Sequence, residues 1–310
     1  MRIGILRCLL FYPLGPFWKT FFTELGFEVI ISPPLSRDNF NQEQRRFVGD
    51  ICLPIESVSG HIIALQHQVD LIFIPRLTDR FNDMYICPVC AGLPDVIMHT
   101  LSNIPPILSI HLTPLVGPTE KDMETLSHHG CTADAITQAY ETALDKYAEM
   151  EKEWRAPART FAGSPHSNLL LLGMPYVVGD SFINIGLPTI LEKHKCKVST
   201  ALNISPQSAF NRVYVEGYPL YWSYAGMSVS ALSQALKTDR PDGVIYLSSF
   251  ACGVDSAVIP IVQSVCRRCE NIPFLHVTVD EHASAAHIEV RVEAFLDCVE
   301  NNLRRKDATT

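Results

Sequence analysis

The chain has 310 residues, of which 47% are hydrophobic and 19% charged, and its formal net charge at pH 7 is -8. This composition is that of an ordinary globular protein and excludes disordered and fibrous classes, while the length suits two α/β lobes better than one core. An acidic chain without a stripe of Lys and Arg argues against nucleic acid or an anionic membrane as the main partner.

The N-terminal segment, MRIGILRCLLFYPLGPFWKTFF, is apolar enough that a signal peptide has to be considered. Arg7 interrupts the apolar run, Pro13 and Pro16 follow it, and no small-residue cleavage site is present. The segment therefore indicates a first strand that runs into a first helix. No stretch of the sequence reaches the roughly 18 to 20 apolar residues of a membrane span, so we expect a cytoplasmic protein with no membrane partner.

The first half of the chain alternates apolar runs with helical spacing. The aromatic and aliphatic residues of 17–25 recur at helical intervals, and Gly26 ends that helix. Short apolar runs predict strands at RIGIL (2–6), FEVIIS (27–32), VDLIFIPR (69–76) and ILSIHL (107–112). From 119 to about 154 the pattern becomes helical, with one long apolar face.

After a segment rich in Pro, Gly and Ser (155–167), the order starts again. NLLLLG (168–173) predicts a strand, and TILEKHKCKVST (189–200) predicts a helix that leads into a strand. DGVIYLSS (242–249) and PFLHVTVD (273–280) complete a second set of strands, with a helix at about 254–270 between them.

The element order predicts an α/β protein made of two Rossmann-like lobes, each an open and mostly parallel sheet with helical additions. We expect an N-terminal lobe at 1–154 that ends in a helical segment, a linker at 155–167, and a C-terminal lobe at 168–310. Ligands of such sheets bind outside the carboxyl ends of the strands. The predicted site is therefore the cleft between the two lobes.

Three of the ten cysteines lie where this geometry places ligands. Cys52 is in ICLP, between two helical patterns, Cys87 is in YICP, after the strand at 69–76, and Cys252 is in SSFACGVD, after the strand at 242–249. A helix that begins near Asp255 would favour the thiolate of Cys252. From the residues alone, these thiols are either shared ligands of a metal or cluster or small buried side chains.

Cys90, two residues beyond Pro88 in YICPVCAGLPD, has three interpretations: a fourth ligand, a resolving thiol, or a core residue. A zinc site held by Cys87 and Cys90 would need a second close pair. The other Cys-x-x-Cys, Cys266 and Cys269, lies within a predicted helix and indicates packing. The remaining cysteines have no ligand context and are interpreted as structural: Cys8, Cys131, Cys196 and Cys298.

The segment DEHASAAH (280–287) follows the last predicted strand. Asp280, Glu281 and His282 lie at the end of that strand, and Glu281 and His282 are the candidate catalytic acid and base. A helix-capping role for these three residues has about equal weight. No Walker A motif, no GxGxxG after a strand and no GxSxG elbow is present. We therefore expect no nucleotide to bind to this chain.

Five segments, in order, resemble the acyl-CoA dehydratase activase-related family: IGILRCLLFYPLGPFWKTFFTELGFEVIISPP, ICLPIESVSGH, YICPVCAGLPD, YLSSFACGVDS and VDEHASAAHIEVRVEAFLD. The members of this family are relatives of the 2-hydroxyacyl-CoA dehydratase subunits and of the double-cubane cluster proteins. The resemblance spans about residues 2 to 300, and the ordered set of motifs is fairly specific.

The resemblance implies two Rossmann-like lobes and an oxygen-sensitive iron–sulfur cluster held by cysteines, either [4Fe-4S] or an [8Fe-9S] double cubane. Carried over by position, the ligands would be Cys52, Cys87 and Cys252. The resemblance also implies a separate ATP-dependent activase as electron donor, a small substrate such as an acyl-CoA, and a homodimer.

The chain departs from the family pattern at three places. Glu56 stands where the family usually has Lys, and a second thiol at the position of Cys90 is rare in the family. The last motif reads DEHASAAH where DEHTGEAG is common. If this loop shapes the substrate pocket, the substrate or the activity differs from that of the relatives.

Two hypotheses follow. The first is an iron–sulfur protein that passes low-potential electrons to a small substrate in an anaerobic cytoplasm. The second is a cluster-free accessory or scaffold protein that binds a small molecule or a dehydratase partner through the same cleft. The substrate, the direction of the reaction, the cluster nuclearity and the choice between a homodimer and a hetero-oligomer are not determined by the sequence.

Overall fold

A computed structural model describes residues 1–36, 40, 51–77, 85–155, 167–204, 213–269 and 271–307. The chain forms two compact units, the first made of Met1–Asp79 with Ile86–Glu153 and the second of Arg80–Tyr85 with Trp154–Thr310. Nearly all of the predicted linker, 155–167, lies outside the described residues. The domain boundaries drawn from the sequence stay a prediction.

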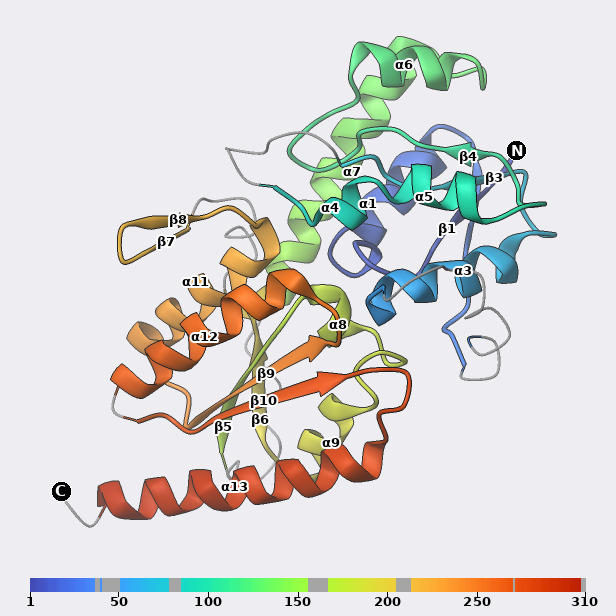
Figure 1. Cartoon of the computed structure of the whole chain (residues 1–310). Coiled ribbons are helices and arrows are strands. Elements are labelled where there is room, and N and C mark those ends of the chain that lie inside the picture. Colours follow the sequence, from blue (N-terminus) through green and yellow to red (C-terminus); the bar gives the residue numbers. More distant parts are fainter. Residues whose placement is uncertain are drawn as a thin grey trace. The chain divides into compact units, whose positions relative to one another are not determined.

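The first unit is built on a four-stranded parallel sheet of order β2-β1-β3-β4 (Figure 1). Its described elements are β1 (Arg2–Ile5), α1 (Phe11–Glu24), β2 (Glu28–Ile31), α3 (Leu53–Leu65), β3 (Leu71–Phe73), α4 (Pro88–Ala91), α5 (Leu93–Thr100), β4 (Ile107–Leu108), α6 (Glu120–Ser127) and α7 (Ala133–Trp154).

Aromatic rings fill the core of the first unit because the helical spacing of α1 directs one apolar face at the sheet. Phe22 and Trp18 of α1 lie edge-on to Phe73 of β3, with ring centroids 4.8 and 5.2 Å apart. Phe17, on the same helix, contacts Tyr140 and Tyr147 of α7 in the same way. These contacts attach α1 to both the sheet and the long helix α7.

A buried histidine joins α3 to the end of β2. The His61 side chain is 1% exposed, and its Nδ1 lies 2.9 Å from the Ser32 hydroxyl, which also accepts the Arg7 amide at 2.8 Å. Burial, helped by the charge of Arg7, lowers the pKa of His61 to about 4. His61 is therefore a neutral imidazole in the folded protein at neutral pH.

The second unit repeats the architecture with a parallel sheet of order β10-β9-β5-β6. Its described elements are β5 (Asn168–Leu172), α8 (Pro175–Gly179), α9 (Leu187–Lys193), β6 (Lys197–Thr200), α10 (Ala201–Ile204), β7 (Val213–Val215), β8 (Tyr218–Leu220), α11 (Ser223–Thr238), β9 (Gly243–Ser249), α12 (Gly253–Arg268), β10 (Phe274–Val279) and α13 (Ala285–Asp307).

Helices cover both faces of this second sheet. Figure 1 shows α11 beside α12 on one side of the strands, and α9 beside α13 on the other. All seven residues of β9 are buried, as expected for a central parallel strand with helices on both faces. A separate hairpin of β7 and β8 packs against α11.

One described residue from early in the sequence belongs to the second unit. Tyr85 forms a parallel β-bridge with Trp222, in which the Tyr85 amide donates to the Tyr221 carbonyl at 2.6 Å. The Ser223 amide donates to the Tyr85 carbonyl at 3.0 Å. The second unit is therefore discontinuous in sequence.

The predicted fold class, two α/β lobes with parallel sheets, is confirmed. The helical segment predicted from 119 to about 154 consists of two helices, α6 and α7, because Gly130 takes a left-handed conformation (φ 86°) after the first of them.

The placement of the site in a cleft between the lobes stays a prediction. None of the helices in the described part of the chain has the length and apolarity of a membrane span.

Candidate functional site

Each sheet has a point next to its first strand where the order of the strands reverses. In the first unit this switch point lies between β1 and β3, and in the second it lies between β5 and β9. Loops at the carboxyl ends of the strands diverge there, which leaves space for a ligand. The two switch points are therefore the first places to look for functional side chains.

Cys87 and Cys252 occupy equivalent positions in the two units. Each lies between the third strand of its sheet and the next helix along the chain: β3 and α4 for Cys87, and β9 and α12 for Cys252. Each is the residue that immediately precedes its helix, the N-cap. Cys52 is likewise the N-cap of α3, in the connection from β2 to β3.

The three N-cap thiols share further features. All three cysteines are partly exposed, whereas Cys8, Cys90, Cys196 and Cys266 are buried. Pro54 and Pro88 stand in the first turns of α3 and α4, where the missing amide hydrogen does no harm. Partly exposed thiols at the starts of helices have the character that metal and cluster ligation requires.

Cys90 directly affects Cys87. A hydrogen bond from the Cys90 thiol, helped by the backbone amides of Cys90 and Val89, lowers the pKa of Cys87 to about 6. Cys90 itself is 6% exposed. At neutral pH the Cys87 sulfur is therefore mostly a thiolate, the form that binds metals and attacks electrophiles.

The segment that carries these two cysteines is held by an ion pair. Arg76, just after β3, donates through two guanidinium nitrogens to the Asp95 carboxylate of α5, at 2.9 and 3.0 Å. The Arg76 amide also donates to the Ile110 carbonyl at 3.0 Å. This two-point contact fixes α5, and with it the adjoining α4, against the end of the sheet.

The loop that leads to Cys252 is strained. Ala251, directly before the cysteine, has a φ of 60°, a left-handed conformation that L-residues with a Cβ avoid. The turn closes through the Cys252 amide, which donates to the Ser249 carbonyl at 3.2 Å. The Cys252 sulfur accepts the Asp255 amide of α12 at 3.5 Å. Strain next to a reactive side chain is typical of functional loops.

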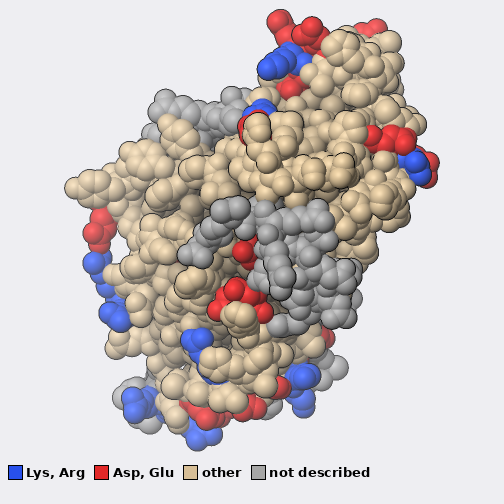
Figure 2. Space-filling view, turned by 45° about the vertical axis from the view of Figure 1, so that its right-hand side comes forward, with Lys and Arg blue, Asp and Glu red and all other residues tan. Residues whose placement is uncertain are grey.

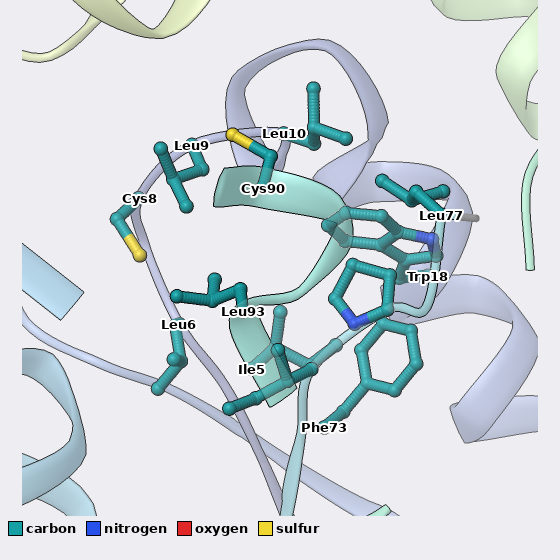
Figure 3. A pocket seen from close by; sticks show the side chains of 12 residues that line it. Ile5, Leu6, Cys8, Leu9, Leu10, Trp18, Phe73, Leu77, Cys90 and Leu93 are labelled. Carbon is teal, nitrogen blue, oxygen red and sulfur yellow. The ribbon is translucent and has the colours of Figure 1, made fainter. Parts of the chain in front are cut away.

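An apolar pocket lies at the switch point of the first unit. Figure 3 shows side chains from the loop after β1, the loop after β3, and the start of α5 converging on it, with the sulfur atoms of Cys8 and Cys90 at its wall. Trp18 and Phe73 close its base. Its cavity volume is about 30 Å³, and its lining is almost entirely apolar. Such a space suits a small apolar group.

The candidate acid and base, Glu281 and His282, lie in the turn after β10. Glu281 Oε1 is 3.5 Å from His282 Nε2, and the His282 side chain is 85% exposed. The His282 amide donates to Asp280 Oδ1 at 2.9 Å, which stabilises the turn. The residue that caps α13 is Ser284, whose hydroxyl accepts the His287 amide at 3.4 Å. The catalytic role of Glu281 and His282 stays a prediction.

None of the ten cysteines forms a disulfide bond in the structure. Cys266 is a buried residue of α12, and burial raises the pKa of its thiol to about 12. Cys269 immediately follows the end of that helix. In the residues that the structure describes, no group of three or more His, Cys, Asp or Glu side chains is arranged to hold a metal ion. Cys52, Cys87 and Cys90 belong to the first unit and Cys252 to the second.

Charged side chains are mixed on the surface that Figure 2 displays. Lys and Arg occur there singly or in small groups beside Asp and Glu, among larger uncharged areas. This face offers no extended basic surface of the kind that tracks a nucleic acid backbone.

Two family models match the chain. One, described as the CoA enzyme activase uncharacterised domain, covers residues 2–204. The other, described as the 2-hydroxyglutaryl-CoA dehydratase D-component, covers residues 121–299. The chain belongs to this family of activase-related and dehydratase D-component proteins. The family predicted from the sequence motifs is thereby confirmed. Among curated proteins, none matches the chain.

The family match covers all of the candidate ligands. Cys52 and Cys87 lie within the activase-domain match, and Cys252 lies within the D-component match, as do Glu281 and His282. Sequence reasoning missed a buried pair, Tyr246 and Asp255, beside Cys252. The signal for Asp255 was its position three residues after the N-cap cysteine, and no sequence signal pointed to Tyr246.

Proposed function

We propose that this protein binds an iron–sulfur cluster, of the [4Fe-4S] or double-cubane type, through Cys52, Cys87 and Cys252. Such a cluster supplies one-electron chemistry at low potential. In this proposal the electrons come from a separate ATP-dependent activase, and the acceptor is a small substrate, an acyl-CoA thioester. The protein works as a homodimer in an anaerobic cytoplasm. Cys90 is the candidate for a fourth ligand, and Glu281 and His282 are the candidate acid and base.

One observation carries the proposal: the three cysteines that match the family motifs are all partly exposed N-cap residues, and four other cysteines are buried. The chemistry of this donor set fits the cofactor, because iron–sulfur clusters are held by thiolates. The lowered pKa of Cys87 supports its role as a thiolate ligand. Ten cysteines without a disulfide bond are consistent with a reducing compartment.

Two features of the first unit support a low-potential environment. The pocket beside Cys90 gives one side of the α4 segment an apolar surround. The Arg76–Asp95 ion pair holds that segment in place. A rigid and partly apolar surround preserves the geometry of a cluster and limits its exposure to solvent, both of which influence its potential.

The first test is the iron and acid-labile sulfide content after strictly anaerobic purification, together with the EPR spectrum of the dithionite-reduced protein. We expect roughly four or more irons per chain with matching sulfide. Each of Cys52→Ala, Cys87→Ala and Cys252→Ala is expected to abolish the spectrum. Cys131→Ala, which alters another partly exposed cysteine that is not among the proposed ligands, is the matched control.

Each other outcome has a defined meaning. Full iron content in all three alanine variants would rule out these residues as ligands. Absence of iron, even after anaerobic reconstitution, would favour the cluster-free accessory protein that the altered DEHASAAH loop and Glu56 also fit. Zinc that is lost in both Cys87→Ala and Cys90→Ala would indicate a structural zinc site instead.

A further inference from the structure

A buried carboxylate lies beside Cys252. Asp255, in the first turn of α12, is 1% exposed, and its backbone amide donates to the Cys252 sulfur at 3.5 Å. Its side chain points inward, where Oδ1 accepts the hydroxyl of Tyr246 at 2.8 Å. Asp255 therefore links Cys252 to the core, because its backbone amide bonds to the Cys252 sulfur and its carboxylate bonds to Tyr246.

Tyr246 belongs to the middle of β9 and is fully buried. Burial and the Asp255 carboxylate raise the pKa of Tyr246 well above its usual range, so the phenol is neutral and its hydroxyl donates a hydrogen bond to Asp255. Its ring lies edge-on to His276 of β10, with centroids 6.5 Å apart. The strand therefore holds the Tyr246 hydroxyl in one position under the start of α12.

Helix capping alone does not account for this arrangement. An acidic residue three positions after the N-cap commonly stays near solvent and turns back toward the N-cap amide. Here the Cys252 amide donates to Ser249, and the Asp255 carboxylate is turned toward Tyr246 in the core. Burying a carboxyl group is unfavourable for folding unless it is hydrogen-bonded, and the Tyr246 hydroxyl supplies such a bond.

We propose that Tyr246 and Asp255 are positioning residues for Cys252. The Tyr246 hydroxyl fixes the Asp255 carboxylate, which fixes the first turn of α12 and the amide that the Cys252 sulfur accepts. In the cluster-loaded protein, the buried carboxylate also places a negative charge close to the cluster and lowers its reduction potential. This second part rests on the proposed function, and the first part does not.

The test uses two nearly isosteric variants of the full chain, Tyr246→Phe and Asp255→Asn. Tyr140→Phe is the matched control, because it also removes one tyrosine hydrogen bond, that from Tyr140 to the Thr113 carbonyl at 3.1 Å in the first unit. Thermal unfolding of each variant establishes that it is folded. Hydrogen exchange of the peptide that covers 250–258 is then measured in iron-free protein.

We expect exchange in this peptide to be about tenfold faster in both variants and unchanged in Tyr140→Phe. In anaerobic, cluster-loaded protein, EPR-monitored titration is expected to give a higher midpoint potential for Asp255→Asn than for the wild type. Tyr246→Phe, which disturbs the same turn but keeps the Asp255 carboxylate, is the reference for this potential, because hydrogen bonds to the sulfur and solvent exposure also influence it.

Unchanged exchange in both variants would overturn the positioning role. Faster exchange with an unchanged midpoint potential would overturn the electrostatic part alone. If the wild type holds no iron, the proposed function fails, and the exchange experiment still decides whether Tyr246 and Asp255 position Cys252.

Discussion

At the scale of single residues, Cys90 sets the chemistry of Cys87. Because the Cys90 thiol donates the hydrogen bond that most lowers the pKa of Cys87, Cys90→Ala is expected to raise that pKa from about 6 toward the ordinary thiol range. The measurement is the pH dependence of Cys87 alkylation by iodoacetamide in iron-free protein, followed by mass spectrometry. Cys131→Ala should leave the midpoint unchanged. An unchanged midpoint in Cys90→Ala would show that the backbone amides suffice.

Ala251 is the second residue whose conformation makes a prediction. Glycine adopts its left-handed φ of 60° without a steric penalty, so Ala251→Gly is expected to raise the free energy of unfolding by about 0.5 kcal/mol. The same substitution at Ala148, exposed within α7, should lower it by about 1 kcal/mol. Urea unfolding measures both changes. A loss of stability in Ala251→Gly would mean that the loop is not strained.

At the scale of secondary-structure elements, His61 makes the contact of α3 with the end of β2 sensitive to acid. Its pKa is about 4 in the folded protein and 6.5 as the ordinary value, so the folded state prefers the neutral form. The contribution of neutral His61 to the free energy of unfolding is fully present above pH 6.5. It is lost at about 1.4 kcal/mol per pH unit as the pH falls toward 4.

The wild type should therefore lose about 2 kcal/mol more unfolding free energy between pH 7 and pH 5 than His61→Gln, in which the amide retains a partner for Ser32. Urea unfolding at the two pH values checks this. His287→Gln, at an exposed position, is the control and should behave as the wild type. Equal losses in wild type and His61→Gln would show that the pKa of His61 is not lowered by folding.

Strands and helices with a continuous apolar run or face were predictable from the sequence. The β5 and β9 segments are buried on both sides and lack competing signals, so their positions were clear. The β7–β8 hairpin was missed because its tyrosines, Tyr214 and Tyr218, are exposed and no alternation marks a core face. Glu216 and Gly217 of its turn both have positive φ, as in a tight hairpin turn with glycine as the second residue. Gly217 was therefore a sequence signal for this turn.

The candidate site was predictable only in part. A cysteine after an apolar strand could be predicted to lie in a loop. The motifs around Cys52, Cys87 and Cys252 indicated the family, which the family models match. The N-cap positions of Cys52 and Cys87 could not be predicted from the sequence, because they depend on where α3 and α4 begin. The bond from Tyr246 to Asp255 joins a strand to a helix, and only the folded backbone brings them together.

At the scale of the whole molecule, each unit has its own sheet and core, which makes the second unit a candidate for independent folding. A fragment of residues 154–310 is expected to unfold in one cooperative thermal transition, with an enthalpy of about 110 kcal/mol at its midpoint. Differential scanning calorimetry measures this, with the full chain as reference. A broad transition without a heat-absorption peak would show that the fragment does not fold alone.

The discontinuity at Tyr85 bears on how the protein is synthesised and how it can be recombined. Tyr85 leaves the ribosome well before Trp222. The β-bridge between these two residues therefore cannot form until most of the chain has been translated. The bridge consists of backbone hydrogen bonds, which any residue except proline can supply at position 85. A chimaera joined near residue 154 from two relatives would therefore keep this bridge even when the two parents differ at position 85.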